Sequence, residues 1–139
     1  MRISTGIALG STMIKPLAGR HLNEDRSAGC AWGMVSMATP NEADRLINEG
    51  MDIKIMLPCG CKGNIIGSGL CLVNRPDGTD TLTMGIVHLF NDHVMTKKDW
   101  TMERLIDWVR TVEPADPEED AHAANPQTVP RRDEVLSLR

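Results

Sequence analysis

The spacing of apolar residues changes twice along this chain of 139 residues, and this change limits the fold more than any other feature. Through the first fifty residues, apolar positions recur at the three-to-four-residue spacing of amphipathic helices. Between residues 53 and 87, two runs alternate apolar and polar side chains, which is the period of half-buried strands. Helical spacing returns at residues 101–112. The pattern predicts an α+β fold with N-terminal helices, a small antiparallel sheet or hairpin, a C-terminal amphipathic helix and an extended tail.

Three helices are predicted in the first fifty residues. The first has Ser4 as its N-cap and runs to Ile14, shortly before a proline. The second covers residues 30–38 and also ends before a proline. The third follows a cap at Asn41 and ends at Gly50.

Strands are predicted in the middle of the chain. Residues 53–57 alternate apolar and polar side chains and form one strand. Residues 69–87 are predicted to form a β-hairpin, with an Asn-Arg-Pro-Asp-Gly turn and with Leu82, Met84 and Ile86 on one face of the second strand.

The last helix has the clearest signal. Thr101 is a good N-cap, and Pro114 stops the helix. Its apolar face carries Leu105, Ile106, Val109 and Val112, with Trp108 beside them.

Residues 1–113 are therefore expected to form a single α+β domain, and residues 114–139 an acidic, Pro-containing extended tail. Such a tail has too little apolar surface to fold alone, so it is expected to become ordered only against a protein partner, with Val135 and Leu136 as anchors. The alternative is a solvated tail without a task.

Charge and composition exclude several classes of protein. Residues 1–112 hold twelve acidic and twelve basic side chains, whereas residues 113–139 hold seven and three, so the net charge of −4 arises at the C-terminal end. A neutral body with no cluster of Lys or Arg, in a chain with 3% aromatic residues, is a poor nucleic-acid binder. The longest uncharged stretch, residues 27–41, is too short to span a membrane. The N-terminus lacks a signal cleavage site, which predicts an uncleaved cytosolic product.

Four side chains form the one constellation with recognisable chemistry: Cys59, Cys61, His88 and His93. Two thiolates and two imidazoles suit zinc, and the four residues between the histidines fall in the usual range. The cysteines are only one residue apart, and 26 residues separate Cys61 from His88, against about 12 to 15 in a compact finger. A hairpin between the two pairs accounts for the long gap and predicts a zinc-ribbon-like centre.

Other interpretations of these residues are open. Cys59 and Cys61 could be reduced thiols in a loop, with the histidines satisfying backbone groups, or the site could hold a disulfide or another metal. Cys30 and Cys71 lie in apolar runs and are predicted to be small core residues.

The sequence carries no recognisable catalytic motif. His88, Asp92 and His93 resemble a general acid–base cluster, but no Ser or Cys has the setting of a nucleophile, and there is no phosphate-binding loop or dinucleotide fingerprint. The sequence therefore predicts a protein that is not an enzyme.

The chain resembles a group of small uncharacterised proteins from bacteriophages and bacterial genomes. Their pattern of His-Leu-Asn-Asp and a second His, followed by Trp-Thr and a helix ending in Asp-Trp, corresponds to residues 86–93 and 100–109. The Ser-capped helix at residues 4–16 and the Gly-Cys-Ala at residues 29–31 are also similar. Together the matches touch about two thirds of the chain.

The resemblance implies a zinc site at Cys59, Cys61, His88 and His93, because many members carry Cys-x-x-Cys upstream of the histidines, where this chain has Cys-Gly-Cys. It also implies a phage or mobile-element origin. We therefore expect a non-enzymatic, zinc-stabilised phage-type protein that binds another protein through residues 114–139, either as a virion component or as a host-directed factor in the host cytoplasm. The alternative is a zinc-dependent nucleic-acid-binding module or nuclease. The sequence sets no oligomeric state.

Overall fold

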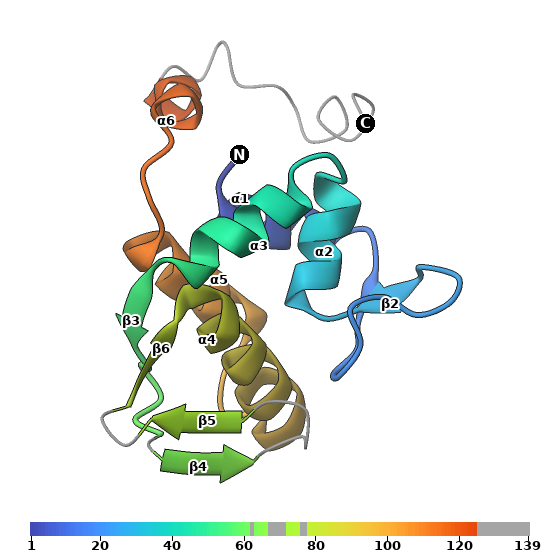
Figure 1. The fold of residues 1–139 in the computed structure, drawn as a ribbon. Helices are drawn as coiled ribbons and strands as arrows, with labels where there is room; N and C mark the ends of the chain where they lie inside the picture. Colours follow the sequence, from blue (N-terminus) through green and yellow to red (C-terminus); the bar gives the residue numbers. More distant parts are fainter. Residues whose placement is uncertain (62, 67–71, 76–77, 125–139) are drawn as a thin grey trace.

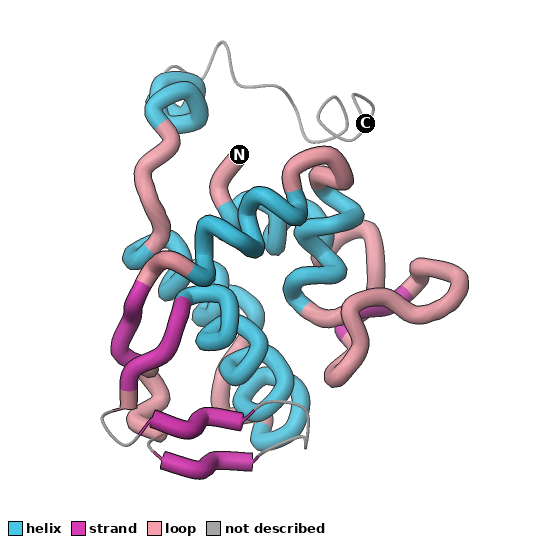
Figure 2. The backbone as a smooth tube through the Cα atoms, viewed as in Figure 1, coloured by secondary structure: helices cyan, strands magenta, loops and turns pink. Residues whose placement is uncertain are grey.

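The computed structural model describes residues 1–61, 63–66, 72–75 and 78–124. In chain order its elements are α1 (Ile3–Gly10), β1 (Lys15–Pro16), β2 (Ala28–Gly29), α2 (Ala31–Ala38), α3 (Ala43–Met51), β3 (Lys54–Met56), β4 (Gly63–Ile66), β5 (Leu72–Arg75), β6 (Thr79–Thr81), α4 (Leu82–His88), the π-helix η1 (Leu89–Lys97), α5 (Met102–Val112) and α6 (Pro117–Ala124). Figure 1 shows a helical body with β3 to β6 toward one end, and Figure 2 separates the two kinds of element by colour. The predicted α+β class is confirmed.

The three predicted N-terminal helices are present, but two have different ends. α1 stops at Gly10, before the predicted end at Ile14. Ser4, predicted as the N-cap, lies inside α1, and Asn41 does not cap α3, which follows Glu42. α2 agrees with its predicted range to within one residue.

A close contact between α1 and α2 explains the glycine at the end of α1. A Cβ atom on Gly10 would lie 2.0 Å from the carbonyl oxygen of Met34, so only glycine permits this approach of the two backbones. Ile7 of α1 and Val35 of α2 are fully buried, and Ile3 almost fully. This contact forms part of the hydrophobic core.

The strand predicted at residues 53–57 is confirmed as β3, but the hairpin predicted at residues 69–87 is wrong. β3 pairs antiparallel with β6, with Ile55 opposite Asp80, and β5 pairs antiparallel with β4. Residues 82–88, predicted as the second strand of the hairpin, form α4.

The helical conformation of α4 has a local cause. The hydroxyl oxygen of Thr81 accepts a hydrogen bond from the N–H of Met84 over 3.2 Å, which caps the first turn. Leu82 and Ile86 are four residues apart and fit both a strand and a helix. Leu89, seven residues after Leu82, fits only a helical face, and all three are fully buried.

The predicted C-terminal amphipathic helix is present as α5. Thr101 accepts the N–H of Arg104 over 3.1 Å, as expected of its N-cap. Leu105 and Val109 are fully buried. Ile106, Trp108 and Val112 are partly buried and pack against the core.

The structure corrects the prediction of an extended tail for residues 117–124, which form α6. Asp116 caps this helix, because its Oδ1 accepts the N–H groups of Glu118 and Glu119, each over 3.1 Å. Acidic side chains in the first turn also interact favourably with the helix dipole. Residues 125–139 lie outside the described residues.

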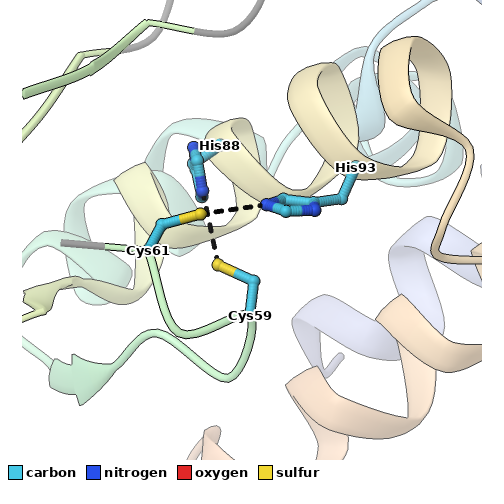
Figure 3. Close-up of side chains that lie close together, drawn as sticks. All are labelled: Cys59, Cys61, His88 and His93. Carbon is cyan, nitrogen blue, oxygen red and sulfur yellow. Dashed lines mark hydrogen bonds between the residues drawn. The ribbon is translucent and has the colours of Figure 1, made fainter.

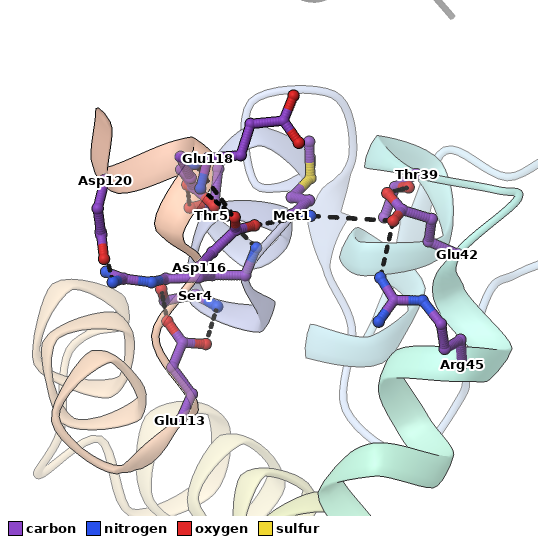
Figure 4. Close-up of polar contacts among 12 residues, drawn as sticks. Met1, Ser4, Thr5, Thr39, Glu42, Arg45, Glu113, Asp116, Glu118 and Asp120 are labelled. Atoms are coloured by element: carbon purple, nitrogen blue, oxygen red, sulfur yellow. Dashed lines mark hydrogen bonds and ion pairs between the residues drawn. The ribbon is translucent and has the colours of Figure 1, made fainter. Parts of the chain in front are cut away.

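The acidic residues around α6 contact the start of α1 (Figure 4). The carboxylate of Glu113 accepts the N–H of Ser4 over 2.9 Å and also accepts its hydroxyl, so Glu113 takes the part of a cap for this N–H group. Glu119 accepts the N–H of Arg2 over 2.9 Å, and the Arg2 guanidinium pairs with Asp120. The C-terminal segment thus supplies the hydrogen-bond acceptors that the first turn of α1 needs.

This contact predicts a pH-dependent contribution to stability. Burial raises the pKa of Glu113 above its ordinary value of 4.5, while its hydrogen bonds from Ser4 act in the opposite direction. The folded chain therefore retains this proton to higher pH than the unfolded chain, and the stability linked to Glu113 falls as the pH rises from 4.5 through the folded-state pKa. Urea unfolding of the native chain and of Glu113→Gln should show the native chain losing stability relative to the variant over that range. If the difference in free energy of unfolding between the native chain and Glu113→Gln does not change with pH, the pKa of Glu113 is not raised by folding.

Candidate metal centre

A tight turn after β3 carries both cysteines. The N–H of Gly60 donates to the carbonyl oxygen of Leu57 over 3.3 Å and closes a turn with Pro58 at its second position. Leu57 is buried, which fixes the turn to the core. Gly60 has a φ of 79°, in the left-handed region that favours glycine, so the chain bends between Cys59 and Cys61. Both thiols reach the space in front of the histidine helix (Figure 3).

The two histidines lie on a helix whose hydrogen-bond pattern changes between them. His88 is the last residue of α4, and His93 lies in the π-helix η1 that continues it. In an α-helix, residues five apart point about 140° away from each other. A π-helix closes its turns with bonds between residues five apart, so such residues lie on one side, and π-turns are frequent at functional sites.

The thiols and imidazoles face one another closely. Sγ of Cys59 lies 3.4 Å from Nε2 of His88, and Sγ of Cys61 lies 3.4 Å from Nε2 of His93. The four donor atoms all lie within 4.8 Å of one another. Tetrahedral zinc, with bonds of about 2.3 Å to sulfur and about 2.0 Å to nitrogen, would place sulfur and nitrogen about 3.5 Å apart. The cluster therefore has the dimensions of a site for one metal ion.

Each histidine contacts a carboxylate through its other ring nitrogen. Nδ1 of His88 lies 2.7 Å from Oδ2 of Asp92, and neither side chain is exposed. Nδ1 of His93 lies 3.0 Å and 3.2 Å from the two oxygens of Asp99. The Nε2 atoms remain directed at the sulfurs. This is the arrangement of ligating histidines in metalloproteins, whose second nitrogen bonds a carboxylate, a carbonyl or water.

Burial disfavours the charged forms of Cys59 and His88. Burial raises the pKa of the Cys59 thiol to about 11; the backbone of Cys61 opposes this change and the Cys61 thiol adds to it. Burial also lowers the pKa of His88, although Asp92 opposes this change. A divalent cation would stabilise the thiolate and bind the neutral imidazole, so metal binding would release protons at neutral pH.

The structure brings together all four residues predicted as ligands, Cys59, Cys61, His88 and His93. A hairpin does lie between the two pairs, but it is β4–β5 and not residues 69–87. The alternative in which the histidines satisfy backbone groups does not describe this geometry, since both rings contact side chains on both nitrogens.

The remaining cysteines and the two carboxylates beside the histidines differ in how well the sequence predicted their positions. Cys30 is half-buried and packs against the core, as predicted, and Cys71 lies outside the described residues. Asp92 was recognised in the sequence only as part of an acid–base cluster. Asp99 was missed, because its contact depends on how the chain leaves η1: Lys98, with a φ of 58°, turns it back toward the helix.

Comparisons with known proteins add no assignment. No protein-family model, no curated protein and no solved structure matches this chain. In the described part of the chain, no helix combines the length and the apolar character needed to cross a membrane.

Substitution of one cysteine or one histidine at a time tests whether this cluster binds a metal ion. We expect Cys61→Ser and His93→Ala to lose bound metal and to unfold at lower urea concentration, because metal binding and folding are coupled. Cys30→Ala and His21→Ala are the controls, since Cys30 packs in the core and His21 is an exposed residue that bonds Ser36. Elemental analysis of the purified chains checks the metal content. Native metal content in His93→Ala would show that the cluster is not the binding site.

Proposed function

We propose that this chain is a non-enzymatic domain whose fold is completed by one structural zinc ion and which acts by binding another protein. The convergence of two sulfur and two imidazole donors, with a carboxylate behind each imidazole, carries the zinc assignment. Structural zinc sites have this donor set, and their histidines have carboxylates placed against the second ring nitrogen in this way.

The donor set favours zinc over other common ions. Magnesium and calcium prefer oxygen donors, and this cluster offers sulfur and nitrogen. A tetrahedral arrangement of two thiolates and two imidazoles is typical of zinc. Copper(I), which also prefers soft donors, is the competitor that a binding experiment should include.

The ion would connect two parts of the chain that are far apart in sequence. The turn after β3 carries one pair of ligands and the α4–η1 helix carries the other, with β4, β5 and β6 between them. Connecting the ends of this long loop restricts the unfolded chain, as other cross-links do. In this proposal the ion holds the cysteine turn against the helix and fixes where the β4–β5 hairpin begins.

Two observations support a binding role rather than catalysis. Four protein donors would leave no coordination position for water or substrate. The equal numbers of acidic and basic side chains in residues 1–112 support a protein partner over nucleic acid. The resemblance to phage proteins supports a virion component or a host-directed factor. Because residues 113–120 bond α1, we narrow the proposed partner-binding segment from residues 114–139 to residues 125–139.

Metal removal tests the structural role of zinc. The purified full-length chain should contain about one zinc ion, and treatment with a strong chelator should lower its free energy of unfolding by several kcal/mol. Re-addition of zinc should restore the stability. Well under one zinc ion per chain, together with unfolding that a chelator does not change, would overturn the proposal.

A binding experiment separates a protein partner from the nucleic-acid alternative. In a gel-shift assay at moderate salt, the zinc-loaded chain should neither slow the migration of duplex or single-stranded DNA nor cleave it. The reason is that residues 1–112 have no net positive charge. Removal of residues 125–139 should leave the urea midpoint nearly unchanged but weaken capture of a protein from host extract or virions. Clearly slower migration of DNA in the gel, or zinc-dependent cleavage of DNA, would favour the nucleic-acid-binding module or nuclease instead.

A further inference from the structure

The two histidines of the centre make the same pair of side-chain contacts, although their positions in the sequence do not require this. Each presents Nε2 to a cysteine sulfur and Nδ1 to an aspartate. Asp92 lies on the same helix as His88, one turn further on, whereas Asp99 lies beyond the end of η1. Two unrelated stretches of backbone therefore supply the same contact.

We infer that Asp92 and Asp99 are positioning residues of the metal centre, which hold the imidazoles of His88 and His93 with a proton on Nδ1 and the lone pair of Nε2 directed at the metal. This inference rests on the proposed zinc site. It assigns a role to two carboxylates that would not themselves be ligands of the metal.

The chemistry of a neutral imidazole supports this role. One ring nitrogen carries a hydrogen and donates, and the other accepts or binds a metal. A carboxylate can only accept, so its contact with Nδ1 selects the form in which Nε2 is free to bind. The negative charge behind the ring also makes Nε2 a stronger donor to the metal. Loss of such a partner in other metal sites weakens metal binding by about 10- to 100-fold.

The two aspartates differ in a way that makes the inference testable. Asp92 and His88 are both fully buried, so changing Asp92 disturbs the core as well as the ligand. The Asp99 side chain is 55% exposed, while that of His93, which it contacts, is 4% exposed. A variant at Asp99 should therefore act on the metal site and hardly on the fold.

The position of Asp99 also follows from the backbone. Lys98 ends η1 in the left-handed conformation, and the N–H of Trp100 donates back to the carbonyl oxygen of His93 over 3.4 Å. The Arg104 guanidinium lies 4.0 Å above the Trp100 ring, which is itself almost fully buried. These contacts hold the segment that carries Asp99 against His93 before any metal binds.

The test compares zinc affinity in four full-length chains: native, Asp99→Asn, Asp99→Ala and Asp107→Asn. Affinity is measured by competition with a chromophoric zinc chelator, and urea unfolding is measured in parallel with the metal removed. Asp107, on the exposed side of α5, is the matched control for loss of one surface carboxylate. We expect Asp99→Ala to bind zinc about 10- to 100-fold more weakly than the native chain. The zinc affinity of Asp99→Asn, which keeps an acceptor oxygen, should lie between that of Asp99→Ala and that of the native chain. The zinc affinity of Asp107→Asn should equal that of the native chain.

The metal-free stability separates positioning from a structural role. All four chains should unfold at nearly the same urea concentration without metal. A fifth chain, Asp99→Glu, should recover part of the zinc affinity that Asp99→Ala loses. If Asp99→Ala binds zinc as tightly as the native chain, the inference is wrong while the proposed zinc site stands. If Asp99→Ala weakens the metal-free fold as much as it weakens zinc binding, Asp99 is a structural residue and the inference is also wrong. A native chain that binds no zinc overturns both.

Discussion

The change from α- to π-helical hydrogen bonding after His88 is the constraint on which the candidate centre depends. Without it, His88 and His93 would point in different directions, and the cysteine turn could meet only one of them. Packing holds this helix in place, because Leu89 and Phe90 are fully buried. The side chain of Asn91 also accepts the N–H of Gly19 over 3.0 Å, which anchors η1 to the loop before β2. The core therefore fixes both histidines where they face the cysteine turn.

Sequence reasoning succeeded where a local signal and the tertiary structure agree. The apolar period and the Thr101 cap predict α5, and the chemical types of two cysteines and two histidines predict the cluster that the structure brings together. The same reasoning failed at residues 82–88, where side chains four apart fit two periods and the choice depends on Thr81 and on burial further along the helix. It could not predict a π-helix, because no residue type specifies that hydrogen-bond pattern. The contact of Asp99 was also missed, because it depends on the left-handed conformation of Lys98 where η1 ends.

The acidic C-terminal segment shows how a composition can have more than one structural meaning. Its excess negative charge is typical of a solvated tail. In the structure, Glu113 and Glu119 accept hydrogen bonds from the first turn of α1, and Asp120 pairs with Arg2. Such partners lie more than a hundred residues away, so a search for local caps finds Ser4 instead. The acidic residues of this segment are therefore explained by a contact between residues 113–120 and the start of α1.

X-ray absorption at the zinc edge of the purified chain can show whether Cys59, Cys61, His88 and His93 hold one zinc ion, as we propose. We expect an inner shell of two sulfur atoms at about 2.3 Å and two nitrogen atoms at about 2.0 to 2.1 Å, with no water ligand. A shell of nitrogen and oxygen atoms without sulfur would rule out this zinc centre, because it would place any bound zinc away from the two cysteines.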